Sequence, residues 1–281
     1  MGRSITIFSL AAASLVLGGA AQAATVEVRD AVARVVVTPE ARSDIRVEML
    51  TTNPSLPLSV RTRGGDVIID GDLNRKIRSC SSRGGRSSVT VSGVGEVAYP
   101  DLPQVVIRTP MDVDIKVGGA VFGAVGRSQS LKISNAGCGE WTIANVAGGV
   151  EASQAGSGDM RMGSTGSAVL RVAGSGDVAV RQVSGSLEAD VAGSGDVRVT
   201  QVTGPSLEAR VAGSGDVTVD GGRVDAMSAT VAGSGDVRFN GDAGALKASI
   251  IGSGDIRVRQ VRGSVERTVM GSGEVRVEEA S

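Results

Sequence analysis

The sequence predicts an all-β protein, a single-stranded parallel β-helix with coils of about 19 residues. Three observations lead to this fold class. A glycine-rich tetrapeptide returns at nearly constant spacing, alternating apolar and polar residues lie between its copies, and a second glycine divides each repeat. A fixed period of this length is typical of a solenoid, because each repeat buries its apolar face only by stacking on its neighbours.

The tetrapeptide Gly-Ser-Gly-Asp marks one turn of each coil. Its copies begin at Gly156, Gly174, Gly193, Gly213, Gly233 and Gly252. Variants begin at Gly137 (Gly-Cys-Gly-Glu) and Gly271 (Gly-Ser-Gly-Glu), and successive copies are 18 to 20 residues apart. Glycine tolerates the positive φ angles that tight turns require. The narrow spacing therefore confines insertions to the turns.

The residues beside the tetrapeptide alternate as they do in β-strands. Leu187, Ala189 and Val191 fall on one face of their strand, and after the turn Val197 and Val199 are expected to point inward as well. Alternation with a period of two, rich in β-branched residues, indicates a half-buried strand. A second glycine turn closes each coil, so we expect strands that stack about 4.8 Å apart.

Residues 24–117 are less regular but still resemble strands. Residues 45–49 alternate, and apolar runs of strand length occur at 35–37, 67–69 and 105–107. We expect this part to form the first coils and to cap the stack, with the regular coils following over 118–281 in the same domain, 24–281. Glu274, Glu278 and Glu279 charge the last coil, which disfavours edge pairing. We therefore expect a monomer, with end-on association as the alternative.

Residues 1–23 have the features of a signal peptide. Arg3 precedes the apolar run 5–17, and Ala21-Gln22-Ala23 forms a small-x-small cleavage site. A buried N-terminal helix is the alternative. No later stretch approaches the roughly 20 apolar residues of a transmembrane helix. We expect an exported chain, periplasmic, on the cell surface or secreted, without a transmembrane segment once it is mature.

Composition argues against several classes of function. The formal net charge of −1 gives no reason to expect nucleic acid or an anionic membrane as partner. Histidine, the commonest general base and metal ligand, is absent, and aromatic residues make up 2% of the chain. Glycoside cleavage needs one distinct carboxylate pair, and the repeats single out none. We expect no enzyme and no cofactor; a lyase that uses Lys or Arg as its base is the alternative.

Two cysteines, Cys80 and Cys138, are the only ones in the sequence. In an oxidising compartment outside the cytoplasm they are expected to form one disulfide. The alternative is a pair of separate thiols, with Cys138 simply filling a serine position of the repeat.

The acidic residue of the repeat creates a row of carboxylates along the stack. Stacking places these groups about 5 Å apart, where like charges repel. We favour an interpretation in which each carboxylate caps N–H groups of its own turn while the stacked serines form hydrogen bonds along the row. The alternative is Ca²⁺ bridging between coils. The row consists of Asp159, Asp177, Asp196, Asp216, Asp236 and Asp255, with Glu140 and Glu274 at its ends.

Three further features are candidate binding sites. Residues 72–86 look like an excursion from the solenoid, either a flexible loop or a binding loop for an acidic polymer. Outward arginines follow the turn in several coils and form either a solvated face or a polyanion track. Trp141 is expected to point inward, with sugar stacking as the alternative. The excursion carries Arg75, Lys76, Arg78, Arg83 and Arg86, and the outward row contains Arg198, Arg238, Arg257 and Arg276.

The chain resembles the bacterial "putative auto-transporter adhesin, head GIN domain" family. The resemblance rests on the N-terminal alternating strands, on Thr109-Pro110 followed by residues 113–117, and on the repeated Gly-Ser-Gly-Asp coils. It covers about residues 24 to 278 and implies a right-handed β-helix in the cell envelope, without established chemistry. An autotransporter also needs a C-terminal membrane barrel, whereas Ser281 falls within the last coil.

Together these features favour a non-catalytic envelope protein, an adhesin or structural module that binds a glycan or protein ligand. A periplasmic scaffold that binds a protein or an envelope polymer is the alternative, and a polysaccharide-cleaving β-helix is a third.

Overall fold

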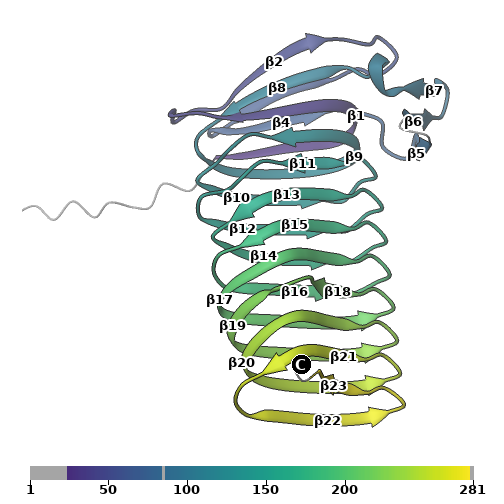
Figure 1. Cartoon of the computed structure of the whole chain (residues 1–281). Helices are drawn as coiled ribbons and strands as arrows, with labels where there is room; N and C mark the ends of the chain where they lie inside the picture. Colours follow the sequence, from purple (N-terminus) through teal and green to yellow (C-terminus); the bar gives the residue numbers. More distant parts are fainter. Residues whose placement is uncertain (1–23, 84–85, 279–281) are drawn as a thin grey trace, which may run out of the picture.

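The computed structural model describes residues 24–83 and 86–278 and has the predicted architecture (Figure 1). Strands make up 68% of the described residues and stack in about nine parallel turns, which confirms the β-solenoid. The predicted signal peptide, residues 1–23, and Glu279 lie outside the described residues. No helix in the described part of the chain is long and apolar enough to cross a membrane.

Each regular coil contributes one strand to each of two sheets. The first sheet contains β10 (Ser130–Asn135), β12 (Gly149–Gln154), β14 (Ser167–Val172), β16 (Leu187–Val191) and β22 (Val265–Gly271). The second contains β11 (Trp141–Ile143), β13 (Met160–Thr165), β15 (Val178–Val183), β18 (Val217–Val219), β21 (Ile256–Val261) and β23 (Val275–Val277). Two longer strands run through the second turn and belong to both sheets: β17 (Val197–Gly213) and β20 (Val237–Gly252). Strand β19 (Gly222–Gly233) begins in the second turn and continues through the first sheet.

The core consists of rows of identical or similar side chains that run along the stack. One such row runs through four successive coils and consists of Ala189, Ala209, Ala229 and Ala248. Rows of Leu or Met and of Val or Ile flank this alanine row, and their side chains are buried between the two sheets. Each coil therefore covers the apolar face of the next, as the period of the sequence predicts.

The N-terminal strands do not stack in the order in which they follow one another along the chain. Strand β1 (Thr25–Pro39) lies between β9 (Asp112–Val125) on one side and β4 (Asp66–Asp70) with β8 (Gln104–Thr109) on the other. Both edges of β1 are thus paired. Strand β1 therefore lies one coil inside the stack. The chain then forms the N-terminal end of the stack with β4 and β8, and β9 returns to the other side of β1.

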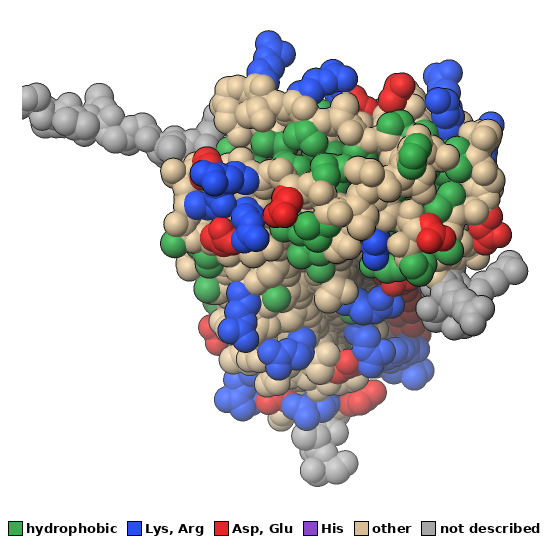
Figure 2. Space-filling model, turned by 90° about the horizontal axis from the view of Figure 1, so that it is seen from above, with side chains coloured by type: hydrophobic (Ala, Val, Ile, Leu, Met, Phe, Trp, Pro, Cys, Tyr) green, Lys and Arg blue, Asp and Glu red, His purple; other side chains and the backbone are tan. Residues whose placement is uncertain are grey.

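Two antiparallel strands close the N-terminal end of the stack. Strand β2 (Arg46–Thr51) pairs with β8, and β3 (Ser59–Arg63) pairs with β4. Seen from above, hydrophobic side chains gather on this end, between charged side chains at its rim (Figure 2). Leu50 and Val60 are among the exposed apolar residues of these strands. The antiparallel strands prevent further parallel coils from adding at this edge.

Residues between β4 and β8 leave the solenoid and fold into a small sheet on its outer surface. This antiparallel sheet contains β5 (Ile77–Arg83), β6 (Arg86–Val91) and β7 (Gly95–Ala98), and the 3-10 turn η1 (Tyr99–Asp101) follows it. Val89 and Val91 of the sheet pack with Val32 and Phe122 of the coils in a second hydrophobic cluster. This packing positions the excursion against the coils of β1 and β9.

Candidate functional site

The carboxylates of the acidic row form hydrogen bonds between coils. Oδ1 of Asp159 accepts the backbone N–H of Asp177 at 3.1 Å, and Oδ1 of Asp177 accepts that of Asp196 at 2.9 Å. The same bond follows at 2.8 Å in each later coil, as far as the N–H of Glu274. Each aspartate therefore joins its own turn to the next one.

The glycine turn explains why an acidic side chain is needed there. The carbonyl of Gly156 accepts two N–H groups of the following coil, from Ser175 and Gly176. The carbonyl of Gly158 instead faces the Cα of Gly176, where an added Cβ would lie 2.1 Å from the oxygen. The next N–H, that of Asp177, is therefore left to the carboxylate of Asp159.

This pattern corrects two details of the sequence interpretation. The carboxylates cap N–H groups of the following coil and not of their own turn. The serines of the row take part through their backbone N–H groups, and among the described residues their hydroxyls form no hydrogen bonds along the row. Sequence spacing could not distinguish these cases, because both place the same residues in the same turn.

The described residues contain no group of three or more His, Cys, Asp or Glu side chains arranged to hold a metal ion. One oxygen of each carboxylate from Asp159 to Asp255 is already an acceptor for a backbone N–H. The row thus has a structural role that needs no cation.

The outward arginines are paired with acids. Arg198 donates two hydrogen bonds of 3.0 Å to Asp220, and Arg276 lies 2.6 Å from Glu274. Arg257 contacts both Asp236 and Asp255, and Arg238 lies 3.9 Å from Asp236. This pairing matches the solvated face and leaves no continuous cationic track.

The basic excursion is a folded sheet and not an open loop. Arg75, Lys76 and Arg78 precede or begin β5, and Arg78 donates to the hydroxyl of Ser92. The side chains of Arg83 and Arg86 lie outside the described part of the molecule. The structure therefore does not gather the five basic residues into one described cluster.

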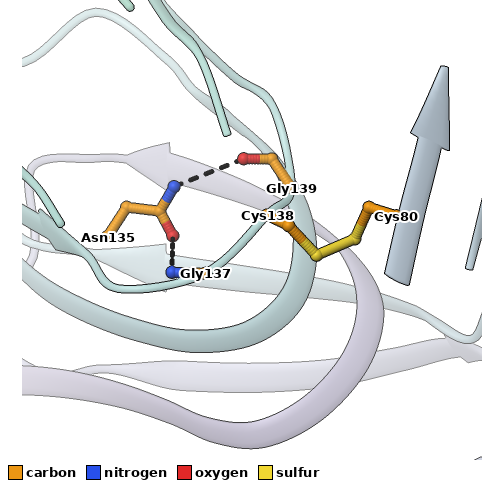
Figure 3. Close-up of a disulfide and its surroundings, with 5 residues drawn as sticks. All are labelled: Cys80, Asn135, Gly137, Cys138 and Gly139. Atoms are coloured by element: carbon orange, nitrogen blue, oxygen red, sulfur yellow. Dashed lines mark hydrogen bonds between the residues drawn. A yellow bond between two sulfur atoms is a disulfide. The ribbon is translucent and has the colours of Figure 1, made fainter. Parts of the chain in front are cut away.

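A disulfide joins this sheet to the solenoid. Cys80 of β5 is bonded to Cys138 in the first glycine turn, with a Cα–Cα distance of 5.9 Å (Figure 3). In the same turn Asn135, which is fully buried, accepts the N–H of Gly137 and donates to the carbonyl of Gly139. The disulfide closes a span of 58 residues, and closing such a span stabilises a fold by about 4 kcal/mol in the chain-entropy model.

A groove of about 600 Å³ opens between the excursion and the coils of β1, β9 and β11. Tyr99, Pro100 and Ala98 form its wall on the excursion, and Phe122 and Val35 belong to the solenoid side. Its polar lining residues are Arg34, Ser87, Gln104, Glu140 and Thr142. Groove and excursion are held in place together by the second hydrophobic cluster and the disulfide.

Aromatic side chains support this groove. The rings of Tyr99 and Phe122 meet edge to face, with centroids 5.3 Å apart, and Tyr99 remains 39% exposed. The guanidinium of Arg34 lies 5.4 Å from the Tyr99 ring centre, and its Nε donates to the carbonyl of Leu102. Cation–π contact and hydrogen bond together fix the arginine beside the ring.

Trp141 lies beneath the groove, inside the solenoid. It is completely buried, as predicted from its position in the repeat, so its ring cannot stack on a sugar. Its ring covers the backbone of Gly123, where a Cβ would lie 2.3 Å from the indole. Phe122 and Gly123 are consecutive on β9, so one residue packs with the excursion while the next accommodates the tryptophan.

Sequence reasoning missed this groove. Aromatic residues make up only 2% of the sequence, yet the fold gathers Tyr99, Phe122 and Trp141 in one region. The available signal was the position of Tyr99-Pro100 at the end of the excursion, directly before a return strand.

Comparison with known proteins supports the fold and the family resemblance. The chain matches the model of the "putative auto-transporter adhesin, head GIN domain" family over residues 183–279. No curated protein matches the sequence.

Two solved structures of Parabacteroides distasonis ATCC 8503 proteins are similar. A putative adhesin superimposes with a TM-score of 0.54 at 16% identity, covering 89% of this chain and 90% of that one. A putative lipid binding protein has a TM-score of 0.52 at 18% identity, covering 91% and 92%. At such identities the likeness concerns the fold. The family match confirms the predicted resemblance in the C-terminal coils: residues 183–279 of this β-solenoid match the model of the head GIN domain family of putative auto-transporter adhesins.

Proposed function

We propose that this protein is an exported, non-catalytic adhesin of the bacterial envelope that binds a saccharide chain in the groove beside Tyr99. The observation that carries this proposal is the groove itself, formed where a disulfide-anchored sheet meets the outer face of the solenoid. The adhesin names of the matched family and of one structural neighbour are consistent with a binding role.

The chemistry of the groove suits a saccharide. A partly exposed tyrosine offers an apolar face to the C–H groups of a sugar ring and a hydroxyl to its polar edge. Arg34, Gln104 and Thr142 supply hydrogen-bond donors, and Glu140 supplies an acceptor beside the same surface. Such a mixture of one aromatic face with several fixed polar groups is typical of small-molecule sites.

The same lining argues for binding without cleavage. Glu140 is the sole carboxylate among the described residues that line the groove, and its side chain lies 3.5 Å from Arg161. Hydrolysis of a glycosidic bond normally needs two carboxylates on either side of the bond. The groove lacks the second one.

A glycan array probed with purified protein tests the proposal. We expect wild-type protein to bind a defined set of saccharides and Tyr99→Ala to lose roughly tenfold in affinity, which corresponds to about 1.4 kcal/mol for the lost ring contact. Tyr99→Phe retains the ring and should keep most of the binding. Leu50→Ala, which removes an exposed apolar side chain at the cap, is the matched control.

Melting curves are recorded to check that each variant is folded. Equal binding by wild-type protein and Tyr99→Ala would refute the assignment of the groove. An array without any bound saccharide would refute the ligand class.

A further inference from the structure

We propose that Arg223, Arg259 and Arg262, held around the carboxylate of Asp242, form a second binding site, for a phosphate group. The site lies on the second turn of the coils, several coils away from the groove beside Tyr99. It does not depend on the proposed saccharide binding.

The cluster combines side chains from three successive coils. Asp242 on β20 is aligned with Arg223 of β19 and with Gln260 of β21. Its Oδ1 accepts a hydrogen bond from Arg259, and its Oδ2 accepts one of 2.7 Å from Arg262. Nη2 of Arg223 lies 3.6 Å from the same Oδ2. One carboxylate thus orients three guanidinium groups at the surface.

The charges at this site do not balance. Among the described residues, Arg223, Arg259 and Arg262 form ion pairs with Asp242 and with no other acid. Asp225, exposed two residues beyond Arg223, forms no ion pair in the described structure. Even with Asp225 included, the arginines outnumber the acids.

A different ion-pair cluster of this solenoid has the opposite ratio. Arg210 contacts three carboxylates, those of Glu188, Asp190 and Glu208. In such a cluster the carboxylates of the protein itself accept the N–H groups of the guanidinium. The cluster around Asp242 retains unused N–H donors, because each guanidinium carries five and one carboxylate accepts only a few.

Asp242 acts as a positioning residue. Its side chain is 12% exposed, whereas those of Arg223, Arg259 and Arg262 are 63%, 50% and 46% exposed. The hydrogen bond from Arg259, with the charges of Arg259 and Arg262, holds the pKa of the Asp242 carboxyl below its usual range. The carboxylate therefore stays charged at neutral pH and keeps the arginines oriented while their outer edges face solvent.

Phosphate is the ligand that this arrangement fits. A guanidinium presents two parallel N–H groups that match two oxygens of a phosphate. Several guanidinium groups around one point suit a tetrahedral phosphate, which has more oxygens to accept their N–H groups than a planar carboxylate has. The phosphate could belong to a lipid headgroup or to a soluble phosphorylated molecule. The experiment distinguishes these sources.

The full-length mature protein is titrated at about 0.15 M salt, where long-range attraction is screened. One arm uses glycerol 3-phosphate and inorganic phosphate, followed by calorimetry. The other uses phosphatidylglycerol vesicles in a flotation assay, with phosphatidylcholine vesicles as the uncharged reference. Binding in the first arm alone assigns a soluble ligand, and binding in the second arm assigns a lipid headgroup.

The test variant is Arg259→Ala with Arg262→Ala, and the control is Arg198→Ala, whose guanidinium forms an ion pair with Asp220 alone among the described residues. We expect the double variant to bind at least about tenfold more weakly, and the control to bind like wild type. The double variant Arg259→Lys, Arg262→Lys keeps the charge and should bind at an intermediate level.

Three results would overturn the proposal: no binding of wild-type protein in either arm, equal binding by wild type and the double alanine variant, or an equal loss in the Arg198→Ala control. The last would indicate general charge attraction. None of these outcomes depends on Tyr99, so failure here leaves the saccharide proposal intact.

Discussion

The backbone N–H of Asp196 donates to Oδ1 of Asp177 across 2.9 Å, from one coil to the preceding one. This bond replaces a strand-to-strand hydrogen bond that the glycine turn cannot form, because the carbonyl of Gly176 faces the Cα of Gly195 at that position. The aspartate of the repeat is therefore a coupling element between coils, and the stability of the stack should depend on its oxygen and not on its charge.

Substitution at Asp196 separates these two properties. Asp196→Asn keeps the Oδ1 acceptor for the N–H of Asp216 and removes one charge from the row. We expect its free energy of unfolding to equal or slightly exceed that of wild type, because repulsion between stacked carboxylates falls. Asp196→Ala removes the acceptor and should destabilise the protein by about 1–2 kcal/mol. Urea unfolding measures both; a lower stability of Asp196→Asn than of Asp196→Ala would contradict the account.

The second glycine of the tetrapeptide should not tolerate a side chain. A Cβ at Gly176 would lie 2.1 Å from the carbonyl oxygen of Gly158, so Gly176→Ala must separate two coils. We expect a loss of about 1–3 kcal/mol. Gly221→Ala is the control, because no atom lies within 4 Å of its added Cβ. Similar melting temperatures for the two variants would show that the turns are looser than described.

Loss of the disulfide should loosen the excursion before the coils. Replacing Cys80 and Cys138 together by serine removes the covalent link, while Val89, Val91 and Phe122 still pack in the second hydrophobic cluster. We expect faster amide hydrogen exchange in β5–β7, unchanged protection in β12–β16, and weaker saccharide binding. Exchange followed by mass spectrometry resolves these segments, and uniform loss of protection along the whole chain would be the contrary result.

Acid should weaken the N-terminal coils through Asp70. Hydrogen bonds from Arg29 and from the N–H of Asp72 lower the pKa of the Asp70 carboxyl. A lowered pKa in the folded state contributes stability above the ordinary aspartate pKa of about 4, and this stability is lost as the pH falls through the lower, folded value. Urea midpoints of wild type should therefore fall below about pH 4 more steeply than those of Asp70→Asn. Identical slopes would exclude this contribution.

The parts of the fold that could be predicted are those in which each repeat packs against the repeat that follows it in the sequence. Leu187, Ala189 and Val191 alternate within one strand, and the next repeat lies directly beside them, so period and alternation determine fold and core together. The location of β1 between β9 and β4 could not be predicted, because it depends on which of several similar apolar strands pair.

The candidate sites show the same limit. The row of carboxylates could be predicted from the sequence, because it repeats with the coils. The direction of its hydrogen bonds could not, because it depends on the orientation of backbone carbonyls such as that of Gly158. Tyr99 and Phe122 meet only because the excursion folds back on the solenoid. Asp242 and Arg262 are 20 residues apart and join through coil stacking at a position where the repeat itself varies.

The central claim, that the groove beside Tyr99 binds saccharide outside the cell, is tested most directly on intact cells. Cells that produce the tagged wild-type protein or Tyr99→Ala are incubated with the fluorescent saccharide selected on the array, and an antibody against the tag measures display. We predict equal antibody staining of intact cells, with saccharide bound only by the wild type. Antibody staining that appears only after permeabilisation, or equal saccharide binding by both proteins, would contradict the claim.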